Sequence, residues 1–378
     1  MTPHETFQYF LERQPEMIES IAGIVDIESP SHGVDGSRAV TDRIVAMAKE
    51  TGVELEIDRI SVDDGDHIVV SAFPGDGKHL MLLGHTDTVH PLGSFEQNPT
   101  RVEGDKFFGC GIFDMKANVV LMFEALRFFA VKGRRPSRPV RILLSCDEEV
   151  GSQTGRPLVE KVAANAEMCL VFEPSLDGKV KTGRKGTGMF TLHAHGIPAH
   201  AGLDPEKGAS AILELSRQIE RIQKFSDPSA GTTVNVTTIR GGTTSNVIPE
   251  HAQCEIDVRF TSMAGFERVD GAIRALKPVD PRVTLRLDGG LNRSPLERTD
   301  PVVGLYQRAN KLAASFGYEL GETQVGGASD GNFVAATGIP VLDGLGIAGD
   351  GAHTLHEHIL VSDIAKRATL VTLLLLDS

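Results

Sequence analysis

The sequence has no long hydrophobic run and no cluster of positive charge, and both absences exclude classes of protein. No stretch approaches the roughly 18 consecutive apolar residues that a membrane-spanning helix needs. Basic residues number 38 against 51 acidic ones, so the formal net charge is −13. No run of Lys and Arg is long enough to resemble a nucleic-acid-binding patch. Neither a membrane nor a nucleic acid is therefore an expected partner.

Cysteine pairs and a secretory leader are also missing. Cys110, Cys146, Cys169 and Cys254 are widely scattered and form no C-x-x-C motif, which is typical of reduced thiols in a large chain. The first six residues lack the basic and then apolar segments of a signal peptide. We therefore expect a cytoplasmic protein.

The first half of the chain alternates between two hydrophobic periodicities. Helical spacing of apolar residues occurs over 6–26, directly after residue 114 and over 157–165. Strand-like segments lie between these helices, at 53–60, 67–73, 79–84, 138–146 and 168–172. This alternation predicts an α/β fold with a mostly parallel, doubly wound sheet.

Near residue 184 the pattern changes, and from about residue 292 it returns. The intervening segment predicts strands and helices in the order βαββαβ, at 188–194, 208–225, 232–239, 251–260, 266–276 and 282–287. That order defines a split, ferredoxin-like unit. We therefore expect one domain made of residues 1–183 and 292–378, interrupted by an inserted domain at 184–291.

Residue types that bind metals lie at four predicted strand ends. In a doubly wound sheet the site lies beyond the carboxyl ends of the strands. Those ends carry His85 with Asp87, then Asp114, then the triplet 147–149, and Glu173. Carboxylates that converge on one crevice repel one another unless cations lie between them. The sequence therefore predicts a metal site.

Each of these signals has an ordinary structural explanation when it is taken alone. His85 and Asp87 could form a hydrogen-bonded pair that caps a strand, and Asp114 could be the N-cap of the helix that follows it. The triplet 147–149 could be a solvated turn. Four independent coincidences at four strand ends are less probable than one shared site.

Short motifs extend over nearly the whole chain. They are G-H-T-D-T-V at 84–89, G-x-G-x-x-D-M-K at 109–116, D-E-E-x-G-S at 147–152, Glu173-Pro174, G-x-x-x-H-A-G at 196–202, G-G-T-x-x-N-V-I-P at 241–249, D-V-R at 257–259, G-G-x-S-D at 326–330, and His353 with Glu357. In combination they resemble the di-zinc metallopeptidases that include bacterial glutamate carboxypeptidase, aminoacylase and succinyl-diaminopimelate desuccinylase. The second motif is no dinucleotide loop, because its sixth position is Asp rather than Gly.

The resemblance implies a ligand set for two zinc ions. His85 and Glu173 would bind one ion, Glu149 and His353 the other, and Asp114 would bridge both. The charges agree with this, because the three carboxylates and a bridging hydroxide balance two Zn²⁺ ions. Such a neutral core can be buried.

The last ligand has a competitor, since His353, His356 and His358 lie close together in sequence. His353 is preferred because it follows a Gly-rich turn and precedes Glu357 by the family's spacing. His356 is the alternative.

The resemblance also implies residues that act beside the metals. Asp87 would orient His85, and Glu148 would be the general base that takes a proton from water. Glu148 and Glu149 are neighbours, so both can face one site only where the strand is already turning. A cis peptide between Asp114 and Met115 is implied as well.

The inserted domain would contribute substrate contacts and form a homodimer. His200 and Asn246 would hold the scissile carbonyl or its oxyanion, and Arg259 and Arg293 are candidates for binding the substrate's carboxylate. Arginines in an acidic protein could equally be ordinary surface ion pairs.

We therefore expect a zinc-dependent hydrolase that cleaves an amide bond and releases an amino acid with a free carboxylate. The substrate would be a small peptide or an N-acyl amino acid. A glutamate-releasing carboxypeptidase is the first interpretation, and an N-acyl-amino-acid deacylase is the alternative. A non-catalytic binding protein of the same fold is an alternative of another class.

Overall fold

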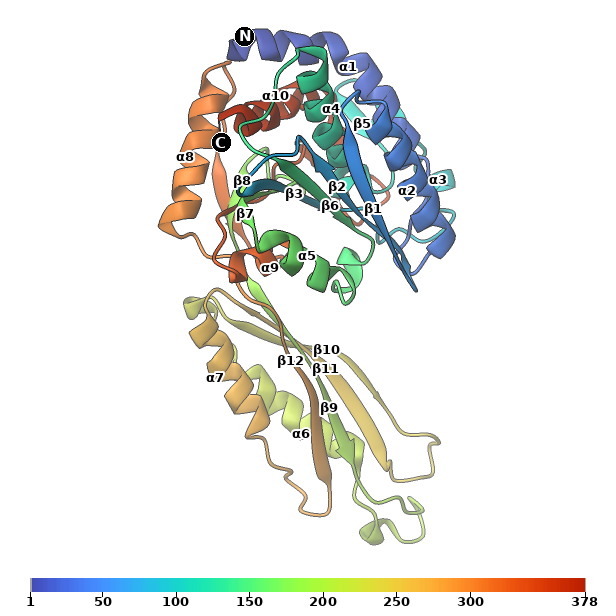
Figure 1. Cartoon of the computed structure of the whole chain (residues 1–378). Helices are drawn as coiled ribbons and strands as arrows, with labels where there is room; N and C mark the ends of the chain where they lie inside the picture. The colour runs from blue at the N-terminus through green and yellow to red at the C-terminus, as the bar shows by residue number, and fades with distance from the viewer. Residues whose placement is uncertain (1, 378) are drawn as a thin grey trace. The chain divides into compact units, whose positions relative to one another are not determined.

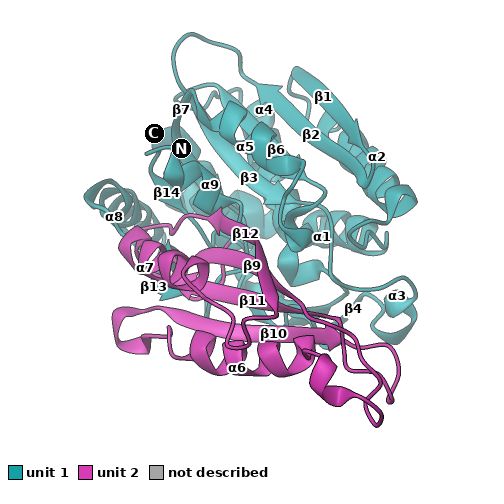
Figure 2. Cartoon of the chain, turned by 90° about the horizontal axis from the view of Figure 1, so that it is seen from below, with its two compact units in different colours: residues 1–183, 298–325, 329–378 teal, residues 184–297, 326–328 magenta. Residues whose placement is uncertain are grey.

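The computed structural model describes residues 2–377, and these form two compact units. Unit 1 contains the described parts of 1–183, 298–325 and 329–378, and unit 2 contains 184–297 and 326–328. Figure 2 colours the two units separately. Each unit has its own hydrophobic core.

The main sheet of unit 1 has six strands in the order β1-β2-β6-β3-β7-β14. Their bounds are Leu55–Val62, Gly65–Ala72, Val140–Ser145, His79–His85, Ala166–Val171 and Val341–Leu342. The four strands from β6 to β14 pair in parallel, whereas β1 and β2 pair antiparallel at one edge. The predicted α/β fold with a mostly parallel sheet is confirmed.

Helices cover both faces of this sheet (Figure 1). One layer contains α1 (Pro3–Val25), α4 (Ala117–Val131) and α10 (Val361–Asp377), which pack against one another. The opposite layer contains α5 (Gly155–Ala163) and α9 (Gly331–Ala336). The remaining helices of unit 1 are α2 (Val34–Lys49), the short α3 (Ser94–Gln97) and α8 (Asp300–Ala314). Helix α4 is buried on nearly every side, as its almost entirely apolar sequence requires.

A second, smaller sheet joins distant parts of unit 1. Its order is β15-β16-β5-β4, with bounds Gly349–Asp350, His358–Leu360, Lys106–Phe108 and Arg101–Glu103. The pairing of β16 with β5 brings the segment around residue 357 beside the segment that begins at Gly109. Two further strands, β8 (Val180–Arg184) and β13 (Glu322–Val325), pair separately.

Unit 2 has the βαββαβ order that its sequence predicts. The elements are β9 (Gly186–His195), α6 (Ala211–Gln223), β10 (Thr233–Gly241), β11 (His251–Phe260), α7 (Met263–Arg274) and β12 (Thr284–Arg293). The antiparallel sheet has the order β10-β11-β9-β12, and both helices lie on one side of it (Figure 1). On β9, Phe190 and Leu192 are therefore buried, whereas Met189 and His195 on the other face are exposed.

The chain leaves unit 1 and returns to it at neighbouring points. In unit 1, the Glu322 carboxylate accepts hydrogen bonds from Thr182 Oγ1 at 2.7 Å and from Arg298 at 2.6 and 2.8 Å. In unit 2, Arg184 and Leu296 exchange two backbone hydrogen bonds of 3.0 Å. The segment that enters unit 2 and the segment that leaves it are thus joined by hydrogen bonds.

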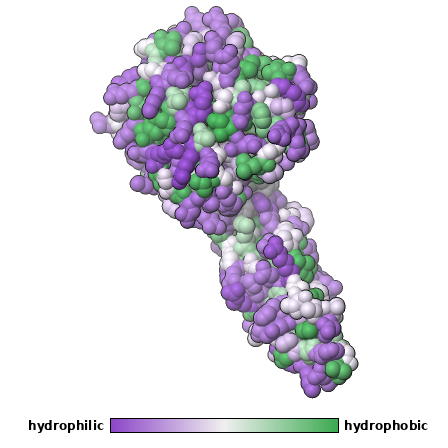
Figure 3. All heavy atoms as spheres, turned by 90° about the vertical axis from the view of Figure 1, so that its right-hand side faces the viewer, coloured by the Kyte–Doolittle hydropathy of each residue, from purple (hydrophilic) through white to green (hydrophobic). Residues whose placement is uncertain are grey.

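Among residues 2–377, no helix combines the length and the hydrophobicity that crossing a bilayer requires. On the face shown in Figure 3, hydrophobic residues form small groups among hydrophilic ones. All four cysteines are free and buried.

Candidate metal centre

Three of the five candidate ligands, His85, Glu149 and Glu173, follow neighbouring parallel strands of unit 1. Asp114 was expected at a strand end of the same sheet, but it lies in the turn Ile112–Lys116, which follows β5 of the smaller sheet, and His353 lies between β15 and β16. His85 is the last residue of β3, and β3 lies between β6 and β7 in the sheet. The turn that contains Glu148 and Glu149 follows β6, and Glu173 follows β7. Because parallel strands end at the same edge, their sequence-distant ends meet there, as the sequence analysis expected.

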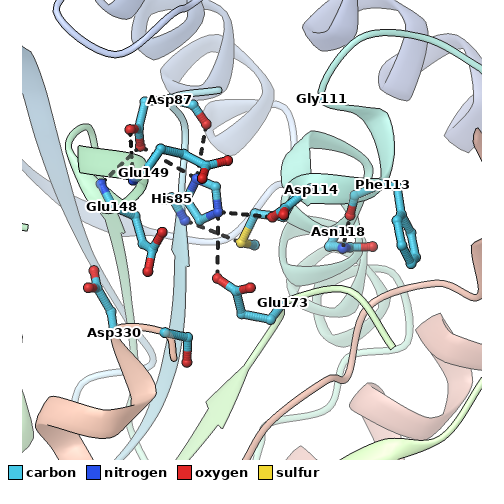
Figure 4. Close-up of polar contacts among 12 residues, drawn as sticks. His85, Asp87, Gly111, Phe113, Asp114, Asn118, Glu148, Glu149, Glu173 and Asp330 are labelled. Carbon is cyan, nitrogen blue, oxygen red and sulfur yellow. Dashed lines mark hydrogen bonds and ion pairs between the residues drawn. The ribbon is translucent and has the colours of Figure 1, made fainter. Parts of the chain in front are cut away.

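One group of metal-binding side chains consists of His85, Asp114 and Glu173. His85 Nε2 lies 3.2 Å from Asp114 Oδ1 and 3.5 Å from Glu173 Oε1 (Figure 4). One potential ligand atom from each residue lies within 4.8 Å of the other two. All three side chains are at most slightly exposed.

A second group shares Asp114 and adds Glu149 and His353. His353 Nε2 lies 3.3 Å from Asp114 Oδ2 and 3.4 Å from Glu149 Oε2. Asp114 thus directs one carboxylate oxygen to each group. His356 belongs to neither group, although the sequence left it as an alternative to His353. The Asp114–Met115 peptide is cis, as the resemblance implied.

Asp87 fastens three parts of the site. Its backbone carbonyl accepts a 3.0 Å hydrogen bond from His85 Nδ1, and its Oδ1 lies 3.4 Å from the same nitrogen. Its carboxylate also accepts from the backbone N–H groups of Glu148 and Glu149, both at 3.2 Å, and from Ser31 Oγ at 2.7 Å. Because His85 Nδ1 is held in this way, Nε2 is directed toward Asp114 and Glu173.

Glu148 begins a 3₁₀ turn, Glu148–Val150. The turn explains how two adjacent glutamates can serve one site, since they no longer alternate as on a strand. Figure 4 shows the Glu148 carboxylate directed away from the Asp87 carboxylate that holds its backbone. Glu148 is in neither ligand group.

The pKa values of the candidate ligands show that the site stabilises positive charge. Burial opposes ionisation of His85, yet hydrogen bonds to Asp114 and Asp87 raise its pKa well above the usual value. Hydrogen bonds to Asp114 and Glu149 raise the pKa of His353 to about 10. Burial also disfavours the charge of Asp114, but its bonds to the two imidazoles lower its pKa. Burial raises the pKa of Glu149.

These residues fit divalent metal ions. Imidazole nitrogens and carboxylate oxygens are typical zinc ligands. Glu149 Oε1 is a buried oxygen with no hydrogen-bond partner among the described residues, although such atoms are normally satisfied. A bound cation would satisfy it and would replace protons as the source of positive charge.

Glu357 has a structural role that the sequence analysis did not assign. Its carboxylate is fully buried and accepts hydrogen bonds from the backbone N–H groups of Gly111, Phe113 and Asp114 at 2.8, 2.8 and 2.9 Å. His90 Nε2 lies 2.6 Å from the same carboxylate. Glu357 therefore fixes the backbone of the loop that carries Asp114. The only sequence signal was the spacing of Glu357 from His353, which resembles that of the metallopeptidase family.

The turn after β6 is fastened by residues that the sequence analysis also left without a role. Asp330 accepts hydrogen bonds from Ser145 Oγ, at 3.0 Å, and from Ser152 Oγ. Asp147 accepts from the backbone and hydroxyl of Thr154 at 2.7 and 2.8 Å. These bonds hold both ends of the turn that presents Glu148 and Glu149.

The four predicted substrate residues all lie in unit 2. His200 and Asn246 are both exposed. Their backbones lie side by side, since the Ala201 N–H donates to the Asn246 carbonyl at 2.9 Å and His200 forms an isolated β-bridge with Val247. Arg259 donates three hydrogen bonds of 2.9 to 3.1 Å to Asp257 on the same strand.

Arg293, the fourth of these residues, is buried at the end of β12. It pairs in register with Thr187 on β9. The substrate roles of all four residues stay predictions.

Comparison with known proteins agrees with this architecture. Carboxypeptidase G2 of Pseudomonas sp. (strain RS-16) is 29% identical over 378 residues, covering 98% of this chain and 91% of that protein. Succinyl-diaminopimelate desuccinylase of Delftia acidovorans is 29% identical over 309 residues, covering 75% and 78%.

Solved structures share the fold. Aminopeptidase PepT of Bacillus cereus superposes with a TM-score of 0.75 at 22% identity, covering 96% of this chain and 98% of that one. The metallo-carboxypeptidase Sso-CP2 of Sulfolobus solfataricus gives 0.70 at 15% identity, covering 95% and 99%.

A family assignment follows from the sequence itself. Residues 81–377 match the pattern of peptidase family M20/M25/M40, which is most of the chain. The predicted resemblance to metallopeptidases and the prediction of a hydrolase are both confirmed. The chain therefore belongs to peptidase family M20/M25/M40.

Proposed function

We propose that the protein is a two-zinc hydrolase that cleaves an amide bond and releases an amino acid with a free carboxylate. The observation that carries this proposal is the pair of ligand groups joined by Asp114. His85 and Glu173 would hold one ion, and Glu149 and His353 would hold the other. A carboxylate with one oxygen in each group is suited to bridge two cations.

Bound zinc ions would supply a hydroxide at neutral pH and would polarise the scissile carbonyl. Glu148 takes the proton of the attacking water and passes it to the leaving amine. The hydrogen bond from the Glu148 backbone N–H to Asp87 fixes the turn that carries both glutamates. Asp87 holds His85 in the orientation that binds through Nε2, and Glu357 holds the loop of Asp114.

His200 is suited to donate a hydrogen bond to the carbonyl oxygen. Its Nδ1 accepts from the backbone N–H groups of Gly202 and Leu203 at 3.2 and 3.1 Å. An accepting Nδ1 carries no proton, so in the neutral ring the proton is on Nε2. Nε2–H is then the donor that an oxyanion requires.

Within the family, the first candidate activity is that of a glutamate-releasing carboxypeptidase. The similarity to carboxypeptidase G2 over 98% of the chain supports this choice, and the similarity to desuccinylases supports a deacylase as the second candidate. Arg259 and Arg293 are the candidates for binding the released amino acid's carboxylate, because a guanidinium pairs with a carboxylate in bidentate fashion. Hydrolysis of a panel of acyl- and peptidyl-amino acids distinguishes the two activities.

The proposed protein is a homodimer, formed through unit 2. The resemblance supports this part of the proposal. We also propose that each subunit places its His200 in the partner's site, because His200 lies in the inserted unit, far in sequence from every candidate zinc ligand. The free, buried state of all four cysteines supports a cytoplasmic location.

The test of the proposed chemistry compares two adjacent residues. Glu148→Gln preserves size but cannot accept a proton, so kcat should fall about 10²- to 10⁴-fold while both zinc ions stay bound. Glu149→Gln should instead lose zinc. Turnover and metal content per chain are measured on both variants. Near-normal turnover of Glu148→Gln, or zinc loss in that variant, would contradict the assigned roles.

A further inference from the structure

A third group of metal-binding side chains lies in unit 2, on the sheet face that α6 and α7 leave bare. His195 is the last residue of β9, and His251 is the first residue of β11. The two residues are direct cross-strand partners. The next pair outward, Gly196 with Glu250, is joined by a 2.7 Å backbone hydrogen bond. Hydrogen-bonded and non-bonded pairs alternate, so the histidines form a non-bonded pair, whose side chains lie closest together.

The two imidazole rings are in contact. Their centroids are 4.6 Å apart with a tilt of 31°, and the two Nδ1 atoms are 3.0 Å apart. Two ring nitrogens at this separation need a proton or a cation between them, because two lone pairs would repel. Glu250 adds a negative charge beside both rings, with carboxylate oxygens 3.8 Å from His195 Nε2 and 3.6 Å from His251 Nε2.

The separations suit a metal ion. One potential ligand atom from each of the three residues lies within 4.8 Å of the other two. Zinc with nitrogen and oxygen ligands at about 2.0–2.2 Å places neighbouring ligand atoms roughly 3.3 Å apart. The side chains are 55%, 41% and 71% exposed for His195, Glu250 and His251, so they can turn inward without disturbing the core.

The surroundings leave this group accessible from solvent. The two histidines line a groove of about 660 Å³, together with His193, Arg240 and Arg286. His193 lies on the same face of β9, but its Nε2 is 3.0 Å from Asp288 and it belongs to no metal-binding group among residues 2–377. The groove leaves room for a water molecule or a small anion as a further ligand.

We propose that His195, Glu250 and His251 form a surface site for one divalent transition-metal ion. Two imidazoles with a carboxylate favour zinc, copper or nickel over magnesium or calcium, which prefer oxygen ligands alone. Three protein ligands leave one coordination position open. The site uses none of the residues that surround Asp114, so it does not depend on the proposed hydrolase activity.

The experiment counts metal ions on the full-length, untagged protein. The zinc-loaded protein is dialysed against buffered zinc, and metal per chain is measured by elemental analysis. Nickel is titrated calorimetrically into the same preparation as a second probe. We expect one equivalent beyond those held near Asp114. His195→Ala and His251→Ala should each weaken this additional binding at least tenfold, since loss even of a residue that only supports a ligand costs 10- to 100-fold.

Two controls make the outcome decisive. His193→Ala removes a histidine of the same groove and should leave the additional equivalent in place. Glu149→Gln should lower the metal content near Asp114 without affecting nickel binding in unit 2. Circular dichroism verifies that each variant is folded. The proposal is overturned if the wild type takes up no additional ion, if the His251→Ala variant retains it, or if His193→Ala removes it equally.

Discussion

The buried carboxylate of Glu357 offers a quantitative test of how the loop that carries Asp114 is held. The substitution is Glu357→Gln, which has nearly the same size but replaces one oxygen by an NH₂ group. Each carboxylate oxygen accepts at least one backbone N–H, so in either orientation the amide nitrogen faces a buried donor. The variant therefore loses hydrogen bonds and leaves at least one N–H without an acceptor.

The expected loss of stability is about 3 kcal/mol. A hydrogen bond to a charged group contributes about 1.5–3 kcal/mol, and a buried donor left unsatisfied costs about 1–3 kcal/mol. Chemical denaturation in the presence of a chelator measures this loss without any contribution from metal. Glu12→Gln is the matched control, because Glu12 is exposed on α1 and its substitution should change stability by no more than about 0.5 kcal/mol.

Metal affinity should fall as well. Residues that support a ligand typically contribute 10- to 100-fold to metal affinity, so zinc should dissociate from the Glu357→Gln variant at a correspondingly lower chelator concentration. A chelator titration of both variants provides the comparison. If Glu357→Gln unfolds like the wild type and keeps its zinc equally well, the carboxylate does not hold the Asp114 loop.

Three further predictions concern catalysis, recognition and pH. Mixed dimers of Glu148→Gln and His200→Ala should regain roughly a quarter of wild-type activity if His200 acts across a two-fold interface, because half of the dimers are mixed and each has one intact site. Proven subunit exchange without recovery would exclude this arrangement. Amidation of the substrate's terminal carboxylate should raise KM or abolish turnover, and Arg259→Lys should not act as a conservative change. Equal hydrolysis of acid and amide substrates would argue against carboxylate recognition. Burial lowers the pKa of His79 from 6.5 to about 4, so its neutral form favours folding and this stability is lost as pH falls through that interval. The loss amounts to about 3 kcal/mol by linkage. In denaturation curves in chelator, His79→Asn should lack this component, and an unchanged pH dependence would refute the assignment.

Local patterns predicted those parts of the fold whose burial is uniform. Strand β3 is buried along its whole length, and its apolar run predicted both the strand and the position of His85 at its end. Helix α2 was missed for the opposite reason. It begins without a side-chain cap, and its buried face includes Ser37 and Thr41, which weaken the apolar periodicity.

Local sequence patterns could not predict contacts between segments that are far apart in the chain. The pairing of β16 with β5 joins residues about 250 positions apart, and each strand has only three residues. The role of Glu357 could not be predicted either. Its carboxylate accepts hydrogen bonds from distant backbone N–H groups, and backbone groups have no sequence signature.

The choice between His353 and His356 depended on a turn. His353 has a φ of 65°, and Gly351, two residues earlier, has a φ of 83°. This left-handed backbone is uncommon for a residue with a side chain, and it directs one imidazole to Asp114 while its neighbours remain elsewhere. Sequence spacing gave the preference for His353 but could not supply this geometry.

The paired ends of unit 2 allow its sequence to vary separately from that of unit 1. The outgoing and returning segments are held together on one side by Glu322 and on the other by the Arg184–Leu296 pair. The residues of both groups around Asp114 belong to unit 1, so substitutions or insertions within residues 185–295 leave their sequence unchanged. Changes of sequence in unit 2 can therefore alter that unit while the residues proposed to bind metal stay the same.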